Sequence, residues 1–272
     1  MHFLYATQRT LNFQNKTTGI ANLKLKDYLE QTSVNIPSIE DQNRCVAVLE
    51  HCQHTIAQCV NLQEKLDTLV KSRFIEMFEG DNFPIVHVED VCTDIVDCPH
   101  TTPKYQGELL FPAIRTTEIK SGFIDWSTMK YVAKAEYEKR VSRLKPMAGD
   151  IVYGREGTYG NAAMLPAGYD FCLGQRVMLF RSDTQKCLPQ YLLQTLLSDD
   201  VKHQADSKNT GSTVAHINVA DAKKFTIPLP PIDIQNQFAD FVAQADKSKL
   251  AIHKLLEKQE LLRTALMQEY FG

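Results

Sequence analysis

The chain has 272 residues, of which 43% are apolar and 23% charged, and its formal net charge is −3. This balance is typical of a globular protein and excludes a largely disordered chain, because disorder combines low hydrophobicity with high net charge. No apolar run is long enough to span a membrane, and the N-terminus lacks the apolar core of a secretory signal. We therefore expect a cytoplasmic protein with no membrane contact.

The cysteine pattern excludes a disulfide framework and a zinc ribbon, because the seven cysteines are odd in number and form no Cys-x-x-Cys. Cys45, Cys52 and Cys59 follow one another at seven-residue steps and would share one stripe of a helix. A metal site on this stripe is disfavoured, since heptad steps leave thiols about 10 Å apart. Small buried side chains at a helix seam are the better interpretation.

The sequence contains an internal repeat, which relates residues 36–80 to residues 227–272. A constant offset superimposes the two copies without a gap after Ile39, and the matched pairs are Ile39 with Ile232, Gln42 with Gln235, Asn43 with Asn236, Leu62 with Leu255, Leu69 with Leu262, Glu76 with Glu269 and Phe78 with Phe271. The likeness extends upstream, where Lys16-Thr17-Thr18-Gly19 resembles Lys208-Asn209-Thr210-Gly211.

Each copy predicts a long helix, because an Ile-Pro start precedes a stretch of about 40 residues without Pro or Gly, with apolar steps of three and four. The apolar stripes comprise Cys45, Val48, Cys52, Cys59, Leu62, Leu66 and Leu69 in the first copy and Phe238, Phe241, Ala245, Ile252, Leu255, Leu262 and Leu266 in the second. Two such helices suit a coiled coil. The stripes leave the direction of pairing open, and a short span between the helices favours antiparallel pairing. The alternative is two unrelated surface helices.

Residues 81–230 predict a separate α+β domain with a mixed or antiparallel sheet, because Gly, Pro and β-branched residues return there. The expected strands are 84–88, 110–114, 130–132, 150–153, 162–165 and 176–181. A helix is expected at 189–197, and helical turns at 135–143 and 219–224.

Five loops of this domain are rich in side chains that read base edges or meet phosphates. They span residues 97–105, 115–122, 154–161, 174–176 and 208–216. Five such loops in one domain predict a binding surface. The domain carries equal numbers of basic and acidic residues between positions 82 and 226, so partners would have to supply some of the phosphate contacts.

Catalytic motifs are scarce: there is no P-loop, no G-x-S-x-G and no H-E-x-x-H. One pattern imitates a metal-dependent nuclease, in which two acids hold Mg²⁺ and a lysine stabilises charge. It consists of Asp97 and, further on, Glu118-Ile119-Lys120. This spacing is common by chance, so the nuclease is the weakest hypothesis.

The whole layout resembles the specificity subunit of type I restriction–modification systems. The matching stretches are Ile227 to Gln235 and, two residues shorter, Ile36 to Gln42, each before a long helix. Within the globule, similar stretches are 97–103, 145–152, 155–160 and 210–212. Together these motifs cover essentially the whole chain.

The resemblance implies an α+β target recognition domain with a mixed or antiparallel sheet, plus two long helices that form a coiled coil. It divides the chain into residues 1–35, the end of a preceding recognition domain; 36–80, the first helix; 81–230, a complete recognition domain; and 231–272, the second helix. A full subunit carries two recognition domains, so this chain resembles a half subunit.

The resemblance also implies a non-catalytic role, in which the domain reads one half of a bipartite DNA target in the major groove. The helices would space the half-sites and dock methyltransferase subunits through the exposed faces of 45–78 and 238–271. The restriction subunit would join afterwards. Two copies of the chain would form a homodimer, and the alternative is that the chain is a fragment of a longer one. No cofactor or metal is expected here, since the methyltransferase would hold the S-adenosylmethionine.

The residues expected to contact DNA are His100, Thr101, Thr102, Lys104, Arg115, Thr117, Lys120, Arg155, Thr158, Tyr159, Gln175, Arg176, Asn209, Ser212 and His216. Arg115, Arg155 and Arg176 are the best candidates for bidentate guanine contacts. Each could instead form a structural ion pair. The rival hypotheses are a coiled-coil adaptor whose globule does not bind DNA and, last, the nuclease.

Overall fold

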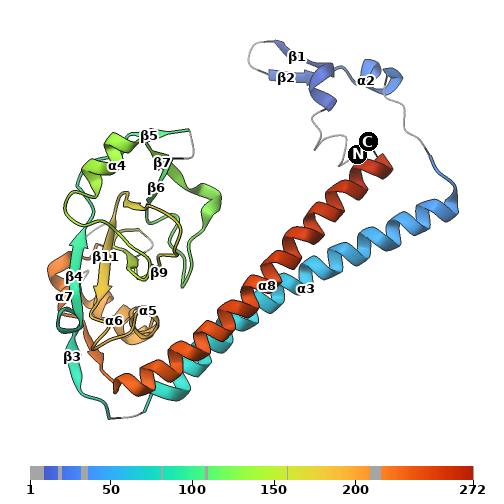
Figure 1. The fold of residues 1–272 in the computed structure, drawn as a ribbon. Helices are drawn as coiled ribbons and strands as arrows, with labels where there is room; N and C mark the ends of the chain where they lie inside the picture. Colours follow the sequence, from blue (N-terminus) through green and yellow to red (C-terminus); the bar gives the residue numbers. More distant parts are fainter. Residues whose placement is uncertain are drawn as a thin grey trace. The chain divides into compact units, whose positions relative to one another are not determined.

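The computed structural model describes residues 9–17, 20–31, 36–80, 82–107, 110–157, 159–208 and 216–271. The chain divides into two compact units, one of residues 1–67 with 246–272 and the other of residues 68–245. Two helices of 40 residues each, α3 (Ile39–Phe78) and α8 (Ile232–Phe271), run from one unit into the other (Figure 1). They confirm the two long helices predicted from the repeat.

The two long helices begin with the same hydrogen bond. At the start of α3, Gln42 Nε2 donates to the carbonyl of Pro37 at 2.9 Å. At the start of α8, Gln235 Nε2 donates to the carbonyl of Pro230 at 2.9 Å. Each proline lies five residues before its glutamine, so the repeated Pro-x-x-x-x-Gln pattern closes the first turn in both copies. The bond satisfies a carbonyl that the change of chain direction leaves without a backbone donor.

The long helices pair antiparallel, which settles the direction that the stripes left open. In the larger unit, the rings of Phe78 and Phe238 lie 5.5 Å apart. In the smaller unit, Asp67 Oδ1 and Lys249 Nζ lie 2.5 Å apart. A step of eleven residues back along α3 therefore matches eleven residues forward along α8, as an antiparallel coiled coil requires.

The heptad cysteines of α3 are buried. Cys45, Cys52 and Cys59 are buried and none of them forms a disulfide. Phe238 and Ala245, which the repeat equates with Cys45 and Cys52, are buried on α8. The burial of the three cysteines agrees with the interpretation as small seam residues, and their position at the seam stays a prediction.

Four leucines assigned to the seam from the sequence are instead exposed. Leu62 and Leu69 of α3 are 48% and 49% exposed, and Leu255 and Leu262 of α8 are 43% and 45% exposed. These are repeat-related pairs, so the departure is the same in both helices. One partner helix covers only a narrow stripe, and these four side chains lie partly outside it.

The N-terminal elements form a small group in the smaller unit. The 3-10 helix η1 (Arg9–Phe13) leads to the antiparallel strands β1 (Gln14–Thr17) and β2 (Ile20–Leu23), followed by α2 (Leu25–Gln31). Tyr28 is buried, and its ring meets the ring of Phe13 at 5.4 Å.

The larger unit contains the globule. Its strands are β3 (Ile85–His87), β4 (Cys92–Asp97), β5 (Tyr105–Gln106), β6 (Phe111–Ile114), β7 (Lys130–Val132), β8 (Ile151–Gly154), β9 (Ala162–Met164), β10 (Cys172–Leu173), β11 (Val177–Ser182) and β12 (Thr226–Pro228). Its helices are η2 (Val88–Val91), η3 (Trp126–Thr128), α4 (Lys134–Arg140), α5 (Pro189–Leu196), α6 (Asp199–Lys208) and α7 (Val219–Lys223).

The described strands of the globule make two four-stranded sheets, β10-β6-β7-β5 and β4-β11-β8-β9, and a ribbon of β12 with β3. β10 pairs parallel with β6 and the other pairs are antiparallel, which confirms an α+β fold with mixed and antiparallel sheets. All six predicted strands are present within a residue or two, as are the helix and the helical turns. Strands β4, β5, β10 and β12 and helix α6 were not predicted from the sequence.

Strand β11 separates two parts of the core. Val177 and Leu179 face a cluster that includes Ile114 and Phe171, whereas Met178 and Phe180 face a cluster that includes α5. Alternate residues of a strand point to opposite faces, so a strand covered on both faces is apolar throughout. This buried strand fixes the loops at its ends.

Candidate nucleic-acid interface

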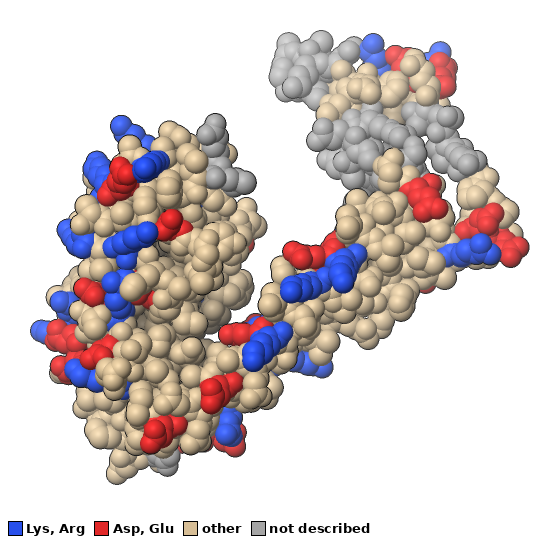
Figure 2. Space-filling model, viewed as in Figure 1, with Lys and Arg blue, Asp and Glu red and all other residues tan. Residues whose placement is uncertain are grey.

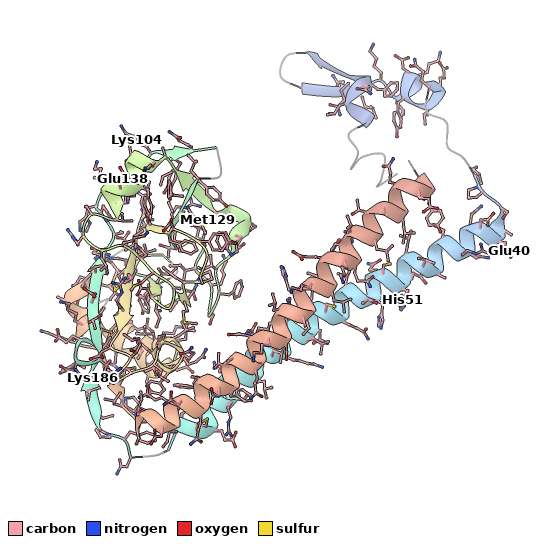
Figure 3. All side chains as sticks on the ribbon, viewed as in Figure 1. Glu40, His51, Lys104, Met129, Glu138 and Lys186 are labelled. Carbon is pink, nitrogen blue, oxygen red and sulfur yellow. The ribbon has the colours of Figure 1, made fainter. Side chains whose placement is uncertain are left out.

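Four of the five predicted loops meet around the start of β11. The carbonyl of Arg176 accepts a hydrogen bond from the Arg155 N–H at 2.9 Å and from Thr116 Oγ1 at 3.1 Å. Beside it, Gln175 Nε2 donates to Thr102 Oγ1 at 2.9 Å. The loops that start at residues 97, 115, 154 and 174 therefore form one continuous surface. Figure 3 shows that Lys104 of the first loop lies at the α4 end of the globule, with Glu138 of that helix, and that Lys186 lies at the other end.

Arg176 has an unusual backbone conformation for a non-glycine residue. Its φ is +61°, the only positive value at a non-glycine residue in the part of the chain that the structure describes. Its side chain is 64% exposed, and its Nε lies 3.0 Å from Glu156 Oε2. A left-handed arginine costs free energy and persists only where its surroundings impose it. Here the strain turns a guanidinium out toward solvent.

Asp97, Arg155, His216, Glu156 and Arg176 form a connected chain of side chains, which we call the Arg155 network. The Arg155 guanidinium pairs with Asp97 and contacts His216 Nε2 at 2.9 Å. Because a guanidinium only donates, His216 Nε2 must accept. The ring proton then lies on Nδ1, which donates to Glu156 Oε1 at 3.1 Å. The network thus links a buried ion pair to the exposed Arg176.

Two of the three arginines predicted to contact guanine form ion pairs within the domain. Arg155 is only 6% exposed, and its charge is paired with Asp97. The Arg115 guanidinium pairs with the fully buried carboxylate of Glu118 and also donates to the carbonyl of Thr128 at 2.9 Å. Both guanidiniums are thus paired with carboxylates inside the domain, a geometry that disfavours the predicted guanine contacts of these two residues. Arg176 is the arginine of the three that presents its donors to a ligand.

The remaining predicted contact residues fall into three groups. Those with exposed side chains are His100, Thr101, Thr102, Lys104, Thr117 and His216. Those partly covered are Lys120, Tyr159 and Gln175, and the Tyr159 hydroxyl donates to Asp206. Thr158, Asn209 and Ser212 lie outside the described residues.

Sequence reasoning missed Arg140, which holds two of the loops together. Its side chain is 1% exposed, and its Nε donates to Glu136 Oε1 at 3.0 Å. One terminal nitrogen donates to the carbonyls of Leu173 and Gly174, and the other to the carbonyl of Thr101. The Glu-x-x-x-Arg spacing of a helical ion pair was readable from the sequence. The three carbonyl partners were not, because they lie far away in the chain.

Basic side chains gather at the α4 end of the globule, whereas both signs of charge are mixed over the rest of the visible face (Figure 2). Lys104, Lys134, Lys139 and Arg143 are exposed there. The equal numbers of acidic and basic residues therefore conceal an uneven distribution, which supplies a cationic edge beside the converging loops.

The site lacks the features of metal or thiol chemistry. Within the described ranges, no group of three or more His, Cys, Asp or Glu side chains is placed to hold a metal ion. The Glu118 carboxylate accepts from the Arg115 N–H and guanidinium, Thr117 Oγ1 and Thr128 Oγ1, which occupies the lone pairs that Mg²⁺ would need. Burial raises the pKa of the Cys98 thiol, so a nucleophilic thiolate is disfavoured.

The Gly174→Ala substitution is expected to destabilise the protein by about 1–3 kcal/mol, as overpacking does. A Cβ at Gly174 would lie 2.5 Å from the Ile114 carbonyl oxygen and 2.8 Å from Arg115 Cγ. Gly107→Ala is the matched control, because a Cβ there meets nothing within 4 Å. Urea unfolding of both variants checks this. Equal unfolding midpoints would mean that the close approach at Gly174 is unimportant.

In sequence, the chain is similar to specificity proteins of type I restriction systems. A family described as type I restriction modification DNA specificity domain matches residues 107–263, more than half of the chain. A putative type I restriction enzyme MjaX specificity subunit from Methanocaldococcus jannaschii is 25% identical over 182 residues, which are 63% of this chain and 41% of that protein. The chain therefore spans less than half the length of this curated relative.

Solved structures share the fold. The type I restriction–modification S subunit from M. genitalium superimposes with a TM-score of 0.61 at 14% identity, over 97% of this chain and 69% of that one. A chain from a study of assembly and conformational transition of a type I restriction–modification system gives a TM-score of 0.53 at 18% identity, over 99% and 70%. Among the described residues, no helix is both long and apolar enough to cross a membrane.

Proposed function

Because the chain belongs to the family of type I restriction modification DNA specificity domains, we propose that it is a non-catalytic subunit that reads DNA sequence. Its globule would read one half of a bipartite target in the major groove. The observation that carries this proposal is the convergence of four polar loops on Arg176, whose exposed guanidinium is held by Glu156. A fork of donors fixed on a rigid strand end suits a guanine edge.

Thr102 and Gln175 would read bases beside Arg176. Their side chains already hydrogen bond to each other at 2.9 Å, so the amide is oriented before DNA arrives. Gln is suited to adenine and Thr to either base edge. His100, 77% exposed and 3.3 Å from Asp97 Oδ2, would lie at the margin of the same contact.

Arg176→Ala is expected to remove about 1–3 kcal/mol of discrimination at a single base pair while leaving binding to unrelated DNA nearly unchanged. Arg44→Ala is the control, because Arg44 is an exposed arginine on α3. The measurement is competition binding of the assembled complex to its preferred site and to single-base variants. Uniform weakening across all sequences would contradict base reading by Arg176.

The outward leucines would dock methyltransferase subunits. Leu62 and Leu69 on α3 match Leu255 and Leu262 on α8 through the repeat, and all four are exposed. An antiparallel pair with equivalent apolar patches on its two helices would offer two equivalent docking faces. A second copy of the chain, giving a homodimer with two recognition domains, is the other use of such a face.

Leu62→Glu combined with Leu255→Glu is expected to abolish methyltransferase binding without unfolding the chain, because both side chains are already about half exposed. The control is Lys65→Glu with Lys258→Glu, which adds charge at other exposed positions of the same helices. Molar mass in solution, alone and with methyltransferase, separates the cases. A homodimer that takes up methyltransferase supports the proposal, and uptake unchanged by the leucine variant would contradict it.

A further inference from the structure

The α4 end of the globule contains a pocket that none of the foregoing roles uses. It has a volume of about 260 Å³. Its charged lining residues are Asp97, Lys139, Arg140 and Arg143, and the rest of the lining is Val96, Pro99, Thr101, Ser142, Leu144 and Leu173. Three basic residues and one acidic residue thus line one concave space.

The charges of this pocket do not cancel. Arg140 is paired with Glu136, and Asp97 is paired with the buried Arg155. Among the residues that the structure describes, the side chains of Lys139 and Arg143 have neither an ion pair nor a hydrogen-bond partner. Because Arg140 and Asp97 are already paired, Lys139 and Arg143 give the pocket a net positive charge, which would attract an anion.

The pocket adjoins the loop surface that would read bases. Thr101 lines it, and the next residue, Thr102, accepts the hydrogen bond from Gln175. The buried Arg140 donates to the carbonyls of Thr101 and Gly174, so it holds the pocket wall and the base-reading loops in one rigid piece. A ligand in the pocket would therefore have a fixed distance to Arg176.

We propose that this pocket binds a phosphodiester group of the DNA backbone through Lys139 and Arg143. The inference rests on the proposed function and adds to it a positioning contact that carries no sequence information itself. The pocket fixes the register of the duplex against Thr102, Gln175 and Arg176. Neither Lys139 nor Arg143 was among the contact residues expected from the sequence.

The test is the salt dependence of DNA binding by the full chain in its assembled complex. For Lys139→Gln combined with Arg143→Gln, the slope of log affinity against log salt falls by about 0.9, because the pocket no longer neutralises one phosphate. Affinity for preferred and for unrelated sequences falls by the same factor, unlike the effect of Arg176→Ala. Lys202→Gln combined with Lys224→Gln is the control that removes the same amount of charge, since both residues are exposed and neither lines the pocket.

Three outcomes overturn the inference. The first is a double variant whose slope and affinity equal those of the control while the wild type still binds specifically; the proposed function would then survive. The second is saturable binding of inorganic phosphate that the variant loses with an unchanged DNA slope, which would make free phosphate the ligand. The third is a loss of unfolding free energy that accounts for the whole effect. Absence of DNA binding by every wild-type assembly would instead refute the proposed function.

Discussion

Replacing Arg140 by methionine is expected to lower the free energy of unfolding by about 3–5 kcal/mol, the cost of breaking a buried ion pair from one side. The substitution leaves Glu136 without its partner and removes the donors of the Thr101, Leu173 and Gly174 carbonyls. Methionine retains much of the apolar stem, so the loss of stability reports the guanidinium. Denaturant unfolding followed by tryptophan fluorescence or circular dichroism measures it.

Lys134→Met on the same helix is the control for this prediction. Its side chain is 78% exposed and lies 3.8 Å from Glu138, so the change should stay within about 0.5 kcal/mol. A loss of stability at Arg140 no larger than that at Lys134 would show that the clamp is unimportant. An Arg140→Met variant as stable as the wild type would also contradict the inference that Arg140 connects the α4 pocket rigidly to the base-reading loops.

Glu118→Ala is expected to cost a similar amount, about 3–5 kcal/mol, because it leaves the Arg115 guanidinium and two threonine hydroxyls without their shared acceptor. Glu138→Ala, whose side chain is 61% exposed, is the matched control. Thermal and urea unfolding of the two variants give the comparison. Equal stability would contradict a structural role for the Glu118 carboxylate.

The same variant separates the structural role from the nuclease hypothesis. If Glu118 held Mg²⁺, the chain would cleave DNA in the presence of that ion, and Glu118→Ala would lose the activity while remaining folded. We expect no Mg²⁺-dependent cleavage by the wild type, because the carboxylate lone pairs are occupied by protein donors. Cleavage that depends on Glu118 at a temperature where both proteins are folded would contradict this account.

The long helices and most of the globule were predictable from the sequence because their signals are local or repeated. The Pro-x-x-x-x-Gln pattern marks both helix starts, and β-branched runs mark the strands. Strand β4 was missed because most of its residues are only partly buried and it directly precedes a polar loop. Helix α6 was missed because it begins Asp-Asp-Val-Lys-His and has only two buried residues.

The candidate site was predictable as a set of loops but not as a set of contacts. Choosing Arg176 required only its residue type and its loop. The burial of Arg155 depends on Asp97, 58 positions earlier, and the orientation of its guanidinium depends on His216, 61 positions later. Such long-range pairs leave no local signal. The leucines were assigned to the helix seam for a different reason. Apolar periodicity identifies one face of a helix, but it does not give the width of that face that a single partner helix covers.

The proposed function requires that this chain supply sequence recognition to a DNA-binding assembly. The most direct test is selection from a random DNA library by the full chain with its methyltransferase subunits, followed by sequencing of the bound fraction. We expect an enriched bipartite motif, with one position that loses its preference in Arg176→Ala. Binding of the library without enrichment, by an assembly that contains the chain, would contradict it.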